Sequence, residues 1–314
     1  MLLVSWLVIL SVSLLLLIKS SVLFTGSAEE IGLTMRIPAF IIGVTIVSVG
    51  TSLPELLTAL FAIKAGTSEI VIGDVIGSNV TNIFLGLGIL PLIIGYFTIT
   101  KNLISVDLPI LIGSSFFIAA TCFDGTFTRF EALFALAGFF IYIKYAVSER
   151  REYKKKFEEE QAKTPKIKAK TIFILIFSCV VLYFSAEYTV KSIIKIAEII
   201  NIGTEIITAS IVALGTSLPE IMASVVSAKK GNIDIAVGTL LGSNIFNAFA
   251  IMGISGLFGN IAIPGNMVHY GIGMLILATM LYFFITLDRE ITKYEGSLLI
   301  IFYGLFIGKL FNFF

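Results

Sequence analysis

A stretch of 44 residues occurs twice in this chain, with the two copies 165 positions apart. Residues 41–84 align with residues 206–249 without a gap, and 19 of the 44 positions are identical. Each copy contains the segment Gly-Thr-Ser-Leu-Pro-Glu, which ends at Glu55 in the first copy and at Glu220 in the second. A single long period with one copy in each half indicates a duplicated half-domain rather than a solenoid of short repeats.

Both copies lie in apolar sequence. Apolar residues make up 57% of the chain, charged residues 14%, and the mean hydropathy is +1.01. This composition is typical of integral membrane proteins, in which a run of about 20 apolar residues crosses the bilayer as a helix. The first run lacks the basic start of a signal peptide and is counted as a helix. The sequence predicts an all-α integral membrane protein with ten transmembrane helices, near residues 2–18, 37–63, 70–97, 103–123, 127–147, 171–190, 204–228, 233–258, 266–287 and 294–313.

Five helices fall in each half. The expected organisation is a first repeat at 1–148, a charged linker at 149–170 and a second repeat at 171–314. Because five is odd, the second repeat must enter the membrane from the side opposite to the first. Two inverted five-helix repeats are the plan of many secondary transporters.

The basic residues are distributed unevenly over the two expected membrane faces. Of the 22 Lys and Arg, 17 fall on the face that carries the linker 149–170. The positive-inside rule therefore places that linker in the cytoplasm and both termini outside. With no organelle signal, a multi-pass protein of the plasma membrane is the expected location, and the linker is too short for a folded regulatory module.

Glu55 and Glu220 each lie well inside an apolar helix. A charged side chain at that depth costs about 2.5 to 3.5 kcal/mol, so such residues normally face an ion path or a partner. No Lys or Arg lies within the same helix core; Lys64 and Lys229 are at the helix ends. Since the glutamates recur at matching positions, a role in ion binding is the favoured interpretation over a protonated or paired structural carboxyl.

A proline precedes each glutamate. Pro54 has no amide hydrogen for the carbonyl of Gly50, and Pro219 none for that of Gly215. Helices 2 and 7 are therefore expected to be broken there, which is tolerated at bilayer depth only where the backbone is buried in protein or lines a watery cavity. The breaks would leave carbonyl oxygens and the hydroxyls of Thr51, Ser52, Thr216 and Ser217 near the glutamates.

Helices 3 and 8 carry a matching polar stripe. Ser78 and Asn82 are four residues apart, as are Ser243 and Asn247, so each pair shares a helix face. These faces can point at the two glutamates. Glycines at small-xxx-small spacing, among them Gly73 with Gly77, are expected to allow close helix packing.

Three further residues in helices 3 and 8 lie off that stripe or break its symmetry. Asn79 and Asn244 are one position away from it and are expected to cap or crosslink the broken helices. Asp74 has Thr239 as its repeat partner. It is expected to be peripheral rather than a ligand.

The candidate ligands are all hard oxygen atoms. Carboxylates, amides, hydroxyls and carbonyls suit Ca²⁺ and Na⁺, whereas zinc and copper prefer histidine or thiolate. Two carboxylates match one Ca²⁺, or several Na⁺ over adjacent subsites, and competition between these occupancies gives a physical basis for exchange. These are transported ions, and no cofactor is expected.

The doubled motif, each copy followed by Gly-Ser-Asn, and the ten helices in inverted halves resemble the Ca²⁺/cation antiporter superfamily, especially its prokaryotic Na⁺/Ca²⁺ exchanger branch. The resemblance implies a core of helices 2, 3, 7 and 8, across which helices 1 and 6 slide. It implies that Ca²⁺ or Na⁺ is held by Glu55 and Glu220 with the carbonyls of Thr51 and Thr216, and that Asn82 and Asn247 flank this centre. By the same resemblance, the inner Na⁺ subsite is the Ser48 carbonyl, Thr51, Ser78 and Glu55, and the outer one is Ala213, Thr216, Ser243 and Glu220.

Other coupling ions remain alternatives. Potassium-dependent relatives have an aspartate where this chain has Asn247, and proton-coupled relatives have a histidine beside the acid. Here Leu56 and Ile221 follow the acids, and the single histidine, His269, is at the start of helix 9. Plain Na⁺/Ca²⁺ exchange is therefore favoured over K⁺-dependent or H⁺/Ca²⁺ exchange.

Other classes of protein fit less well. An uncoupled cation channel could use the same site, but the inverted repeats and broken helices favour a transporter. An intramembrane enzyme would need a base or an acidic dyad, so no enzymatic activity is expected. The expected partners are Ca²⁺, Na⁺ and membrane lipid, with no nucleic acid, and the protein is expected to work as a monomer. Cys122 and Cys179 are interpreted as small buried side chains.

Overall fold

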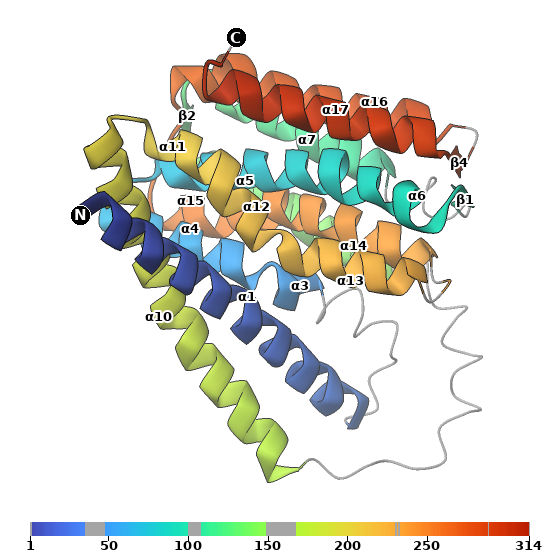
Figure 1. The fold of residues 1–314 in the computed structure, drawn as a ribbon, viewed down its shortest axis with the longest axis horizontal. Helices are drawn as coiled ribbons and strands as arrows, with labels where there is room; N and C mark the ends of the chain where they lie inside the picture. Colours follow the sequence, from blue (N-terminus) through green and yellow to red (C-terminus); the bar gives the residue numbers. More distant parts are fainter. Residues whose placement is uncertain are drawn as a thin grey trace.

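The computed structural model describes residues 2–34, 48–99, 108–148, 168–229, 231, 233–287 and 289–313. Helices dominate it (Figure 1). The first half contains α1 (Leu2–Thr34), α3 (Ser48–Thr51), α4 (Leu53–Ala65), α5 (Glu69–Thr81), the π-helix η2 (Asn82–Leu87), α6 (Gly88–Ile94), α7 (Leu108–Cys122) and α8 (Arg129–Ser148). The second half contains α10 (Ala169–Ile200), α11 (Thr204–Ile207), η4 (Thr208–Val212), α12 (Ala213–Thr216), α13 (Leu218–Lys229), α14 (Ile233–Phe246), η5 (Asn247–Ile251), α15 (Met252–Phe258), η6 (Met267–Gly271), α16 (Ile272–Ile285) and α17 (Lys293–Leu310).

Six helices in the described residues are long and apolar enough to span a membrane. They are Leu2–Ala28, Glu69–Ile94, Ala169–Ile200, Thr204–Lys229, Ala236–Phe258 and Met267–Ile285, with Leu108–Cys122 as a shorter apolar helix. The chain is thus a largely helical membrane protein. Parts of the predicted helices near 37–63 and 103–123, and most of the linker 149–170, lie outside the described residues, so the count of ten stays a prediction.

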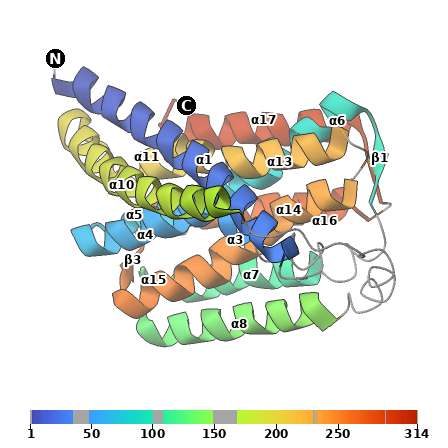
Figure 2. The same ribbon diagram turned by 90° about the horizontal axis from the view of Figure 1, so that it is seen from below.

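The two longest helices, α1 and α10, lie side by side across the outside of the molecule (Figures 1 and 2). Thr189 of α10 donates to the hydroxyl of Ser13 in α1 at 3.0 Å. Both helices expose large apolar side chains, as surfaces in contact with lipid do. The predicted bounds 2–18 and 171–190 were too short, because these helices continue through small polar residues after the apolar runs end.

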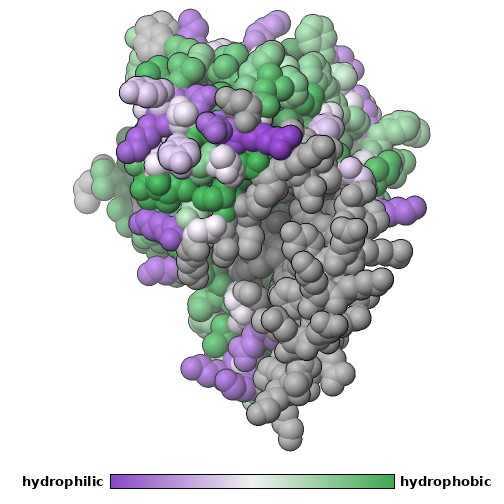
Figure 3. Space-filling view, turned by 90° about the vertical axis from the view of Figure 1, so that its right-hand side faces the viewer, coloured by the Kyte–Doolittle hydropathy of each residue, from purple (hydrophilic) through white to green (hydrophobic). Residues whose placement is uncertain are grey.

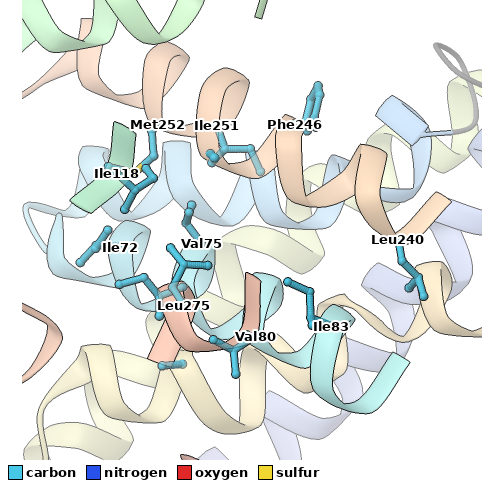
Figure 4. Close-up of a cluster of buried hydrophobic side chains, with 14 of the residues drawn as sticks. Ile72, Val75, Val80, Ile83, Ile118, Leu240, Phe246, Ile251, Met252 and Leu275 are labelled. Carbon is cyan, nitrogen blue, oxygen red and sulfur yellow. The ribbon is translucent and has the colours of Figure 1, made fainter. Parts of the chain in front are cut away.

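The most buried helical segments are α5 with η2 and α14 with η5. Figure 4 shows Val75 and Ile83 from the first of them near Leu240 of α14 and Leu275 of α16. Close packing around α5 depends on its glycines: a β-carbon at Gly77 would lie 2.5 Å from the α-carbon of Ala209. The predicted packing role of Gly73 and Gly77 is confirmed, since both face the backbone of the opposite repeat.

Two short antiparallel strand pairs connect the repeats. β1 (Phe97–Thr98) pairs with β4 (Glu290–Ile291), and β2 (Thr126–Phe127) pairs with β3 (Ile261–Ala262). Each pair takes one strand from each half of the chain. Seen from the side of β1 and β4, the surface mixes hydrophilic and apolar side chains (Figure 3).

The two cysteines differ in exposure. Cys122 is buried, as predicted, but Cys179 is exposed on α10. The prediction for Cys179 was wrong because a lipid-facing position is as apolar in sequence as a core position.

Candidate functional site

The two glutamates lie just after interruptions in helical structure. Helix α3 ends at Thr51 and α4 begins at Leu53, while α12 ends at Thr216 and α13 begins at Leu218. Each interruption is a single residue, Ser52 or Ser217. Both glutamates are buried, each only 1% exposed. Two ionisable side chains at membrane depth are therefore closed off from solvent and lipid.

The carbonyl of Gly50, which Pro54 leaves without its helical donor, has found another partner. The hydroxyl of Ser21 in α1 donates to it at 2.7 Å. This bond satisfies a buried carbonyl and fastens α1 to the interruption before Glu55. The position equivalent to Ser21 in the second repeat is Ala186, which has no hydroxyl to donate.

Four asparagines join the repeats through matching hydrogen bonds. The side-chain amide of Asn79 donates to the carbonyl of Asn244 at 3.2 Å, and that of Asn244 donates to the carbonyl of Asn79 at 3.1 Å. In addition, the Asn82 amide donates to Asn244 Oδ1 at 3.0 Å and the Asn247 amide to Asn79 Oδ1 at 3.1 Å. Asn79 and Asn244 were expected to cap or crosslink the broken helices; they do form a crosslink, but it joins α5 to α14.

This network fixes the orientation of Asn82 and Asn247. Since the amide nitrogen of each is used within the network, its Oδ1 is left over, buried and without a hydrogen-bond partner. Each asparagine is also the first residue of a π-helix, η2 or η5. Single π-turns inside α-helices are frequent at functional sites. Sequence reasoning missed this feature, which has no distinct sequence signal.

Several other buried oxygens from both repeats also lack partners. Among the described residues, eight of the unpartnered oxygens belong to predicted site residues or to Asp74, and they are Glu55 Oε2, Glu220 Oε2, Asp74 Oδ2, Ser78 Oγ, Ser243 Oγ, Ser217 Oγ, Asn82 Oδ1 and Asn247 Oδ1. The other five in that part of the chain are the hydroxyls of Thr58, Thr81, Ser224, Ser255 and Tyr303. Buried polar atoms without partners are costly and rare in folded proteins. Carboxylate, amide and hydroxyl oxygens gathered in this way are the ligands of hard cations such as Na⁺ and Ca²⁺.

Contacts across the repeats bring the two glutamates together. Ser52, from the first repeat, donates to Glu220 Oε1 in the second at 3.0 Å. Glu55 in turn lies close enough to Glu220 for their charges to repel, and it has Thr216 as a hydrogen-bonding neighbour. The glutamates, Ser52 and Thr216 thus form one cluster, as the repeat pattern predicts.

The remaining predicted site residues fall in or beside these elements. Thr51 ends α3 and is 4% exposed, and Ala213 is buried at the start of α12. Ser48 is the first residue of α3, and its side chain lies outside the description. Asp74, which was expected to be peripheral rather than a ligand, is completely buried and touches Thr216 of the other repeat.

Within the described ranges, no three His, Cys, Asp or Glu side chains converge as a metal-binding group. A single cation in this arrangement would depend on at most two carboxylates, supplemented by neutral oxygens. That donor set fits Na⁺ or Ca²⁺ and not a transition metal.

A membrane protein whose buried helices carry unpartnered carboxylate, amide and hydroxyl oxygens has the features of an ion transport protein. The sodium/calcium exchanger protein family model matches this chain over residues 5–147 and 170–311. The chain belongs to that family, whose members are transporters and not enzymes.

Relatives of known sequence and structure agree with this assignment. Sodium/calcium exchanger MaX1 of Methanosarcina acetivorans is 30% identical over 96% of this chain and 97% of its own. The putative antiporter CaxA of Alkalimonas amylolytica is 31% identical over 92% of this chain and 93% of its own. The solved structure of the sodium-calcium exchanger NCX_Mj, soaked with Na⁺ and Ca²⁺, superposes with a TM-score of 0.67 at 28% identity and covers 98% of each chain.

Proposed function

We propose that this protein is a secondary antiporter that exchanges Na⁺ for Ca²⁺ by alternating access to the site around Glu55 and Glu220. The observation that carries the proposal is the set of buried, unpartnered oxygens that both repeats contribute. A cation in their midst would supply the missing partner for many of them at once. The family membership supports the choice of the two ions, and the oxygen set supports binding between the two repeats.

The donor set accommodates both ions. Glu55 and Glu220 supply two negative charges, which balance one Ca²⁺, and the asparagine and serine oxygens add neutral ligands. With Na⁺, the same oxygens divide into adjacent subsites, an inner one at Ser48, Thr51, Ser78 and Glu55 and an outer one at Ala213, Thr216, Ser243 and Glu220. The two occupancies exclude each other because they share the carboxylates.

Exchange instead of leak follows from the burial of these charges. An empty site holds two uncompensated carboxylates in a low-dielectric interior, which costs several kcal/mol per charge. A cation-loaded or protonated site avoids this cost and can be closed off. The protein therefore changes access readily only when cations or protons compensate the carboxylates, which couples the movement of one ion to that of the other.

The architecture supports alternating access between two inverted repeats. Equivalent residues contact each other across the repeats, as in the reciprocal bonds between Asn79 and Asn244. Such matching contacts are expected where a pseudo-two-fold axis relates the two repeats. The interruptions at Ser52 and Ser217 serve as the breaks of helices 2 and 7. Helices α1 and α10 are the elements proposed to slide, because they lie on the outside of the core.

The proposed orientation has both termini outside and the 149–170 linker in the cytoplasm of the plasma membrane. The start of α1 and the end of α17 lie toward the same end of the molecule (Figure 1), which agrees with an even number of crossings. The protein contacts lipid through its apolar surface and works as a monomer, since each chain contains a complete site.

The test is Ca²⁺ uptake into proteoliposomes that contain the purified protein. Vesicles are loaded with Na⁺, with K⁺ or with an acidic buffer, and radioactive Ca²⁺ uptake is measured with the membrane potential clamped. Uptake driven by internal Na⁺ alone is the expected result. Uptake driven by protons, or dependent on K⁺, would replace Na⁺/Ca²⁺ exchange with one of the other antiport reactions, and uptake without any opposing gradient would indicate a channel.

A further inference from the structure

Asp74 is a buried carboxylate that the two-glutamate site does not use. It lies in α5, four residues before Ser78, and therefore on the same helix face as that serine. Its exposed fraction is 0%. The corresponding residue of the second repeat is Thr239, so no symmetry of the fold requires an acid here.

The hydrogen bonds made by Asp74 do not satisfy its charge. Its Oδ1 receives one contact, from the hydroxyl of Thr216 at 3.5 Å, and its Oδ2 has no partner. The same hydroxyl is closer to the carbonyl of Val212, at 3.1 Å. Because a hydroxyl has one hydrogen, its donation to Asp74 competes with the shorter one to Val212. A buried carboxylate in this condition lacks a positive partner.

Asp74 lies at the edge of the site rather than at its centre. It neighbours Thr216, which belongs to the proposed outer Na⁺ subsite, and its charge acts on Glu55. It does not converge with both glutamates in the manner of a metal-binding group. A cation at Asp74 would therefore be a separate ion beside the one at the glutamates.

We propose that Asp74 is a Na⁺-binding residue, which holds a separate Na⁺ beside the outer subsite with the oxygens of Thr216 and Ser78 as further ligands. One carboxylate balances one monovalent ion, whereas Ca²⁺ would need six to eight oxygens and a second charge. The inference rests on the proposed Na⁺/Ca²⁺ exchange. It adds that Na⁺ binding depends on an acid that only the first repeat carries.

The test measures ion binding directly, without transport. The melting temperature of the purified protein in detergent is followed against Na⁺ at constant ionic strength, and separately against Ca²⁺ without Na⁺. Asp74→Asn should raise the Na⁺ concentration for half-maximal stabilisation by about tenfold and lower the Hill coefficient, the size expected for losing one charged contact. The half-maximal Ca²⁺ concentration should change by less than about threefold, under roughly 0.7 kcal/mol.

The matched control is Asp124→Asn, the same change at an acid that only accepts a bond from the backbone of Thr126. It should leave both titrations unchanged. If Asp74→Asn does not yield folded protein, Asp74→Glu keeps the charge but moves it, and its Na⁺ titration should still shift while the Ca²⁺ titration does not.

An unchanged Na⁺ titration in the folded Asp74 variant would overturn the inference, and so would equal losses for both ions. The flux assay separates this result from the fate of the proposed function. If the wild-type protein exchanges Na⁺ for Ca²⁺ but the Asp74 variant has an unchanged Na⁺ titration, only the role of Asp74 is refuted. If Na⁺ stabilises the protein through Asp74 but the wild-type protein shows no Na⁺-driven Ca²⁺ uptake, only the proposed exchange is refuted.

Discussion

The two halves of the site share a framework but differ in the bonds they make. Asn79 and Asn244 form equivalent reciprocal bonds, and Glu55 and Glu220 are equally buried. However, Ser52 donates to Glu220 at 3.0 Å, whereas the hydroxyl of its counterpart Ser217 has no partner. Duplication has preserved the residues that hold the repeats together, while the serine contact to a glutamate is made on one side only.

This difference is what an alternating-access protein requires. A perfectly symmetric site would have no reason to be open to one side of the membrane and closed to the other. In the proposed mechanism the two repeats exchange conformations, so bonds made by one repeat in this structure are expected to be made by the other in the alternate state. Variants of paired residues can test which contacts follow the symmetry and which depend on conformation.

The largest effect is expected from the glutamates, where the repeats should behave alike. Glu55→Gln and Glu220→Gln each remove half of the charge that balances Ca²⁺, and each should reduce Na⁺-driven Ca²⁺ uptake by about a hundredfold or more, the cost of a lost buried ion contact. Glu290→Gln, on the exposed strand β4, is the control. Substantial uptake in either site variant would show that one carboxylate suffices.

A smaller but coupled loss is expected from the asparagine crosslink. Asn79→Ala removes one donor and leaves the buried amide of Asn247 without its acceptor, and Asn244→Ala does the same to the amide of Asn82. Each should cost about 1 to 3 kcal/mol of unfolding free energy. Because they share one network, the double variant should cost clearly less than the sum. Thermal unfolding is measured for the wild type, the two single variants and the double variant, which together form a double-mutant cycle. Losses of unfolding free energy that simply add would contradict a shared network.

The pair Ser52 and Ser217 should reveal the asymmetry. Ser52→Ala removes the bond to Glu220 and should weaken Ca²⁺ binding by about three- to tenfold, as for loss of a hydrogen bond to a charged group. Ser217→Ala removes a hydroxyl with no partner in this conformation and should change binding less. Direct Ca²⁺ titration of both variants measures the difference. Equal losses of Ca²⁺ affinity would refute the asymmetry.

The smallest effect is expected from the contact between α1 and the first interruption. Ser21→Ala removes the donor to the Gly50 carbonyl and gives the first repeat the alanine that the second already has at 186. The rate of exchange should change by a few-fold, because the free-energy difference between the two access states changes by about 1 kcal/mol or less. Ca²⁺ binding should stay the same. Ser20→Ala is the control because Ser20 bonds only within α1. An equal change in both variants would refute a specific tether.

Sequence reasoning reached the buried glutamates because membrane burial makes polar residues informative. A glutamate after a proline in apolar sequence, found twice, predicts an ion path on energetic grounds alone. The four-residue spacing of Ser78 and Asn82 likewise predicts a common face, and both side chains are buried. These inferences need only the helix period and the cost of burial.

Contacts between elements far apart in sequence could not be predicted in this way. Asp74 looked peripheral because its partner, Thr216, comes from the other repeat and is brought to it by the close packing at Gly73 and Gly77. The hydrogen bond from Ser21 to the Gly50 carbonyl could not be predicted either, since it depends on α1 extending past its apolar run. Tertiary packing, and not local pattern, sets both.

The two short strand pairs affect how the chain reaches its final form. β1 and β2 belong to the first half, but their partners β4 and β3 belong to the second. During synthesis, β1 and β2 must therefore wait until residues 290 and 261 have been made before they can pair. The first half is thus inserted into the membrane as an incomplete structure, and it is completed only when the second half joins it.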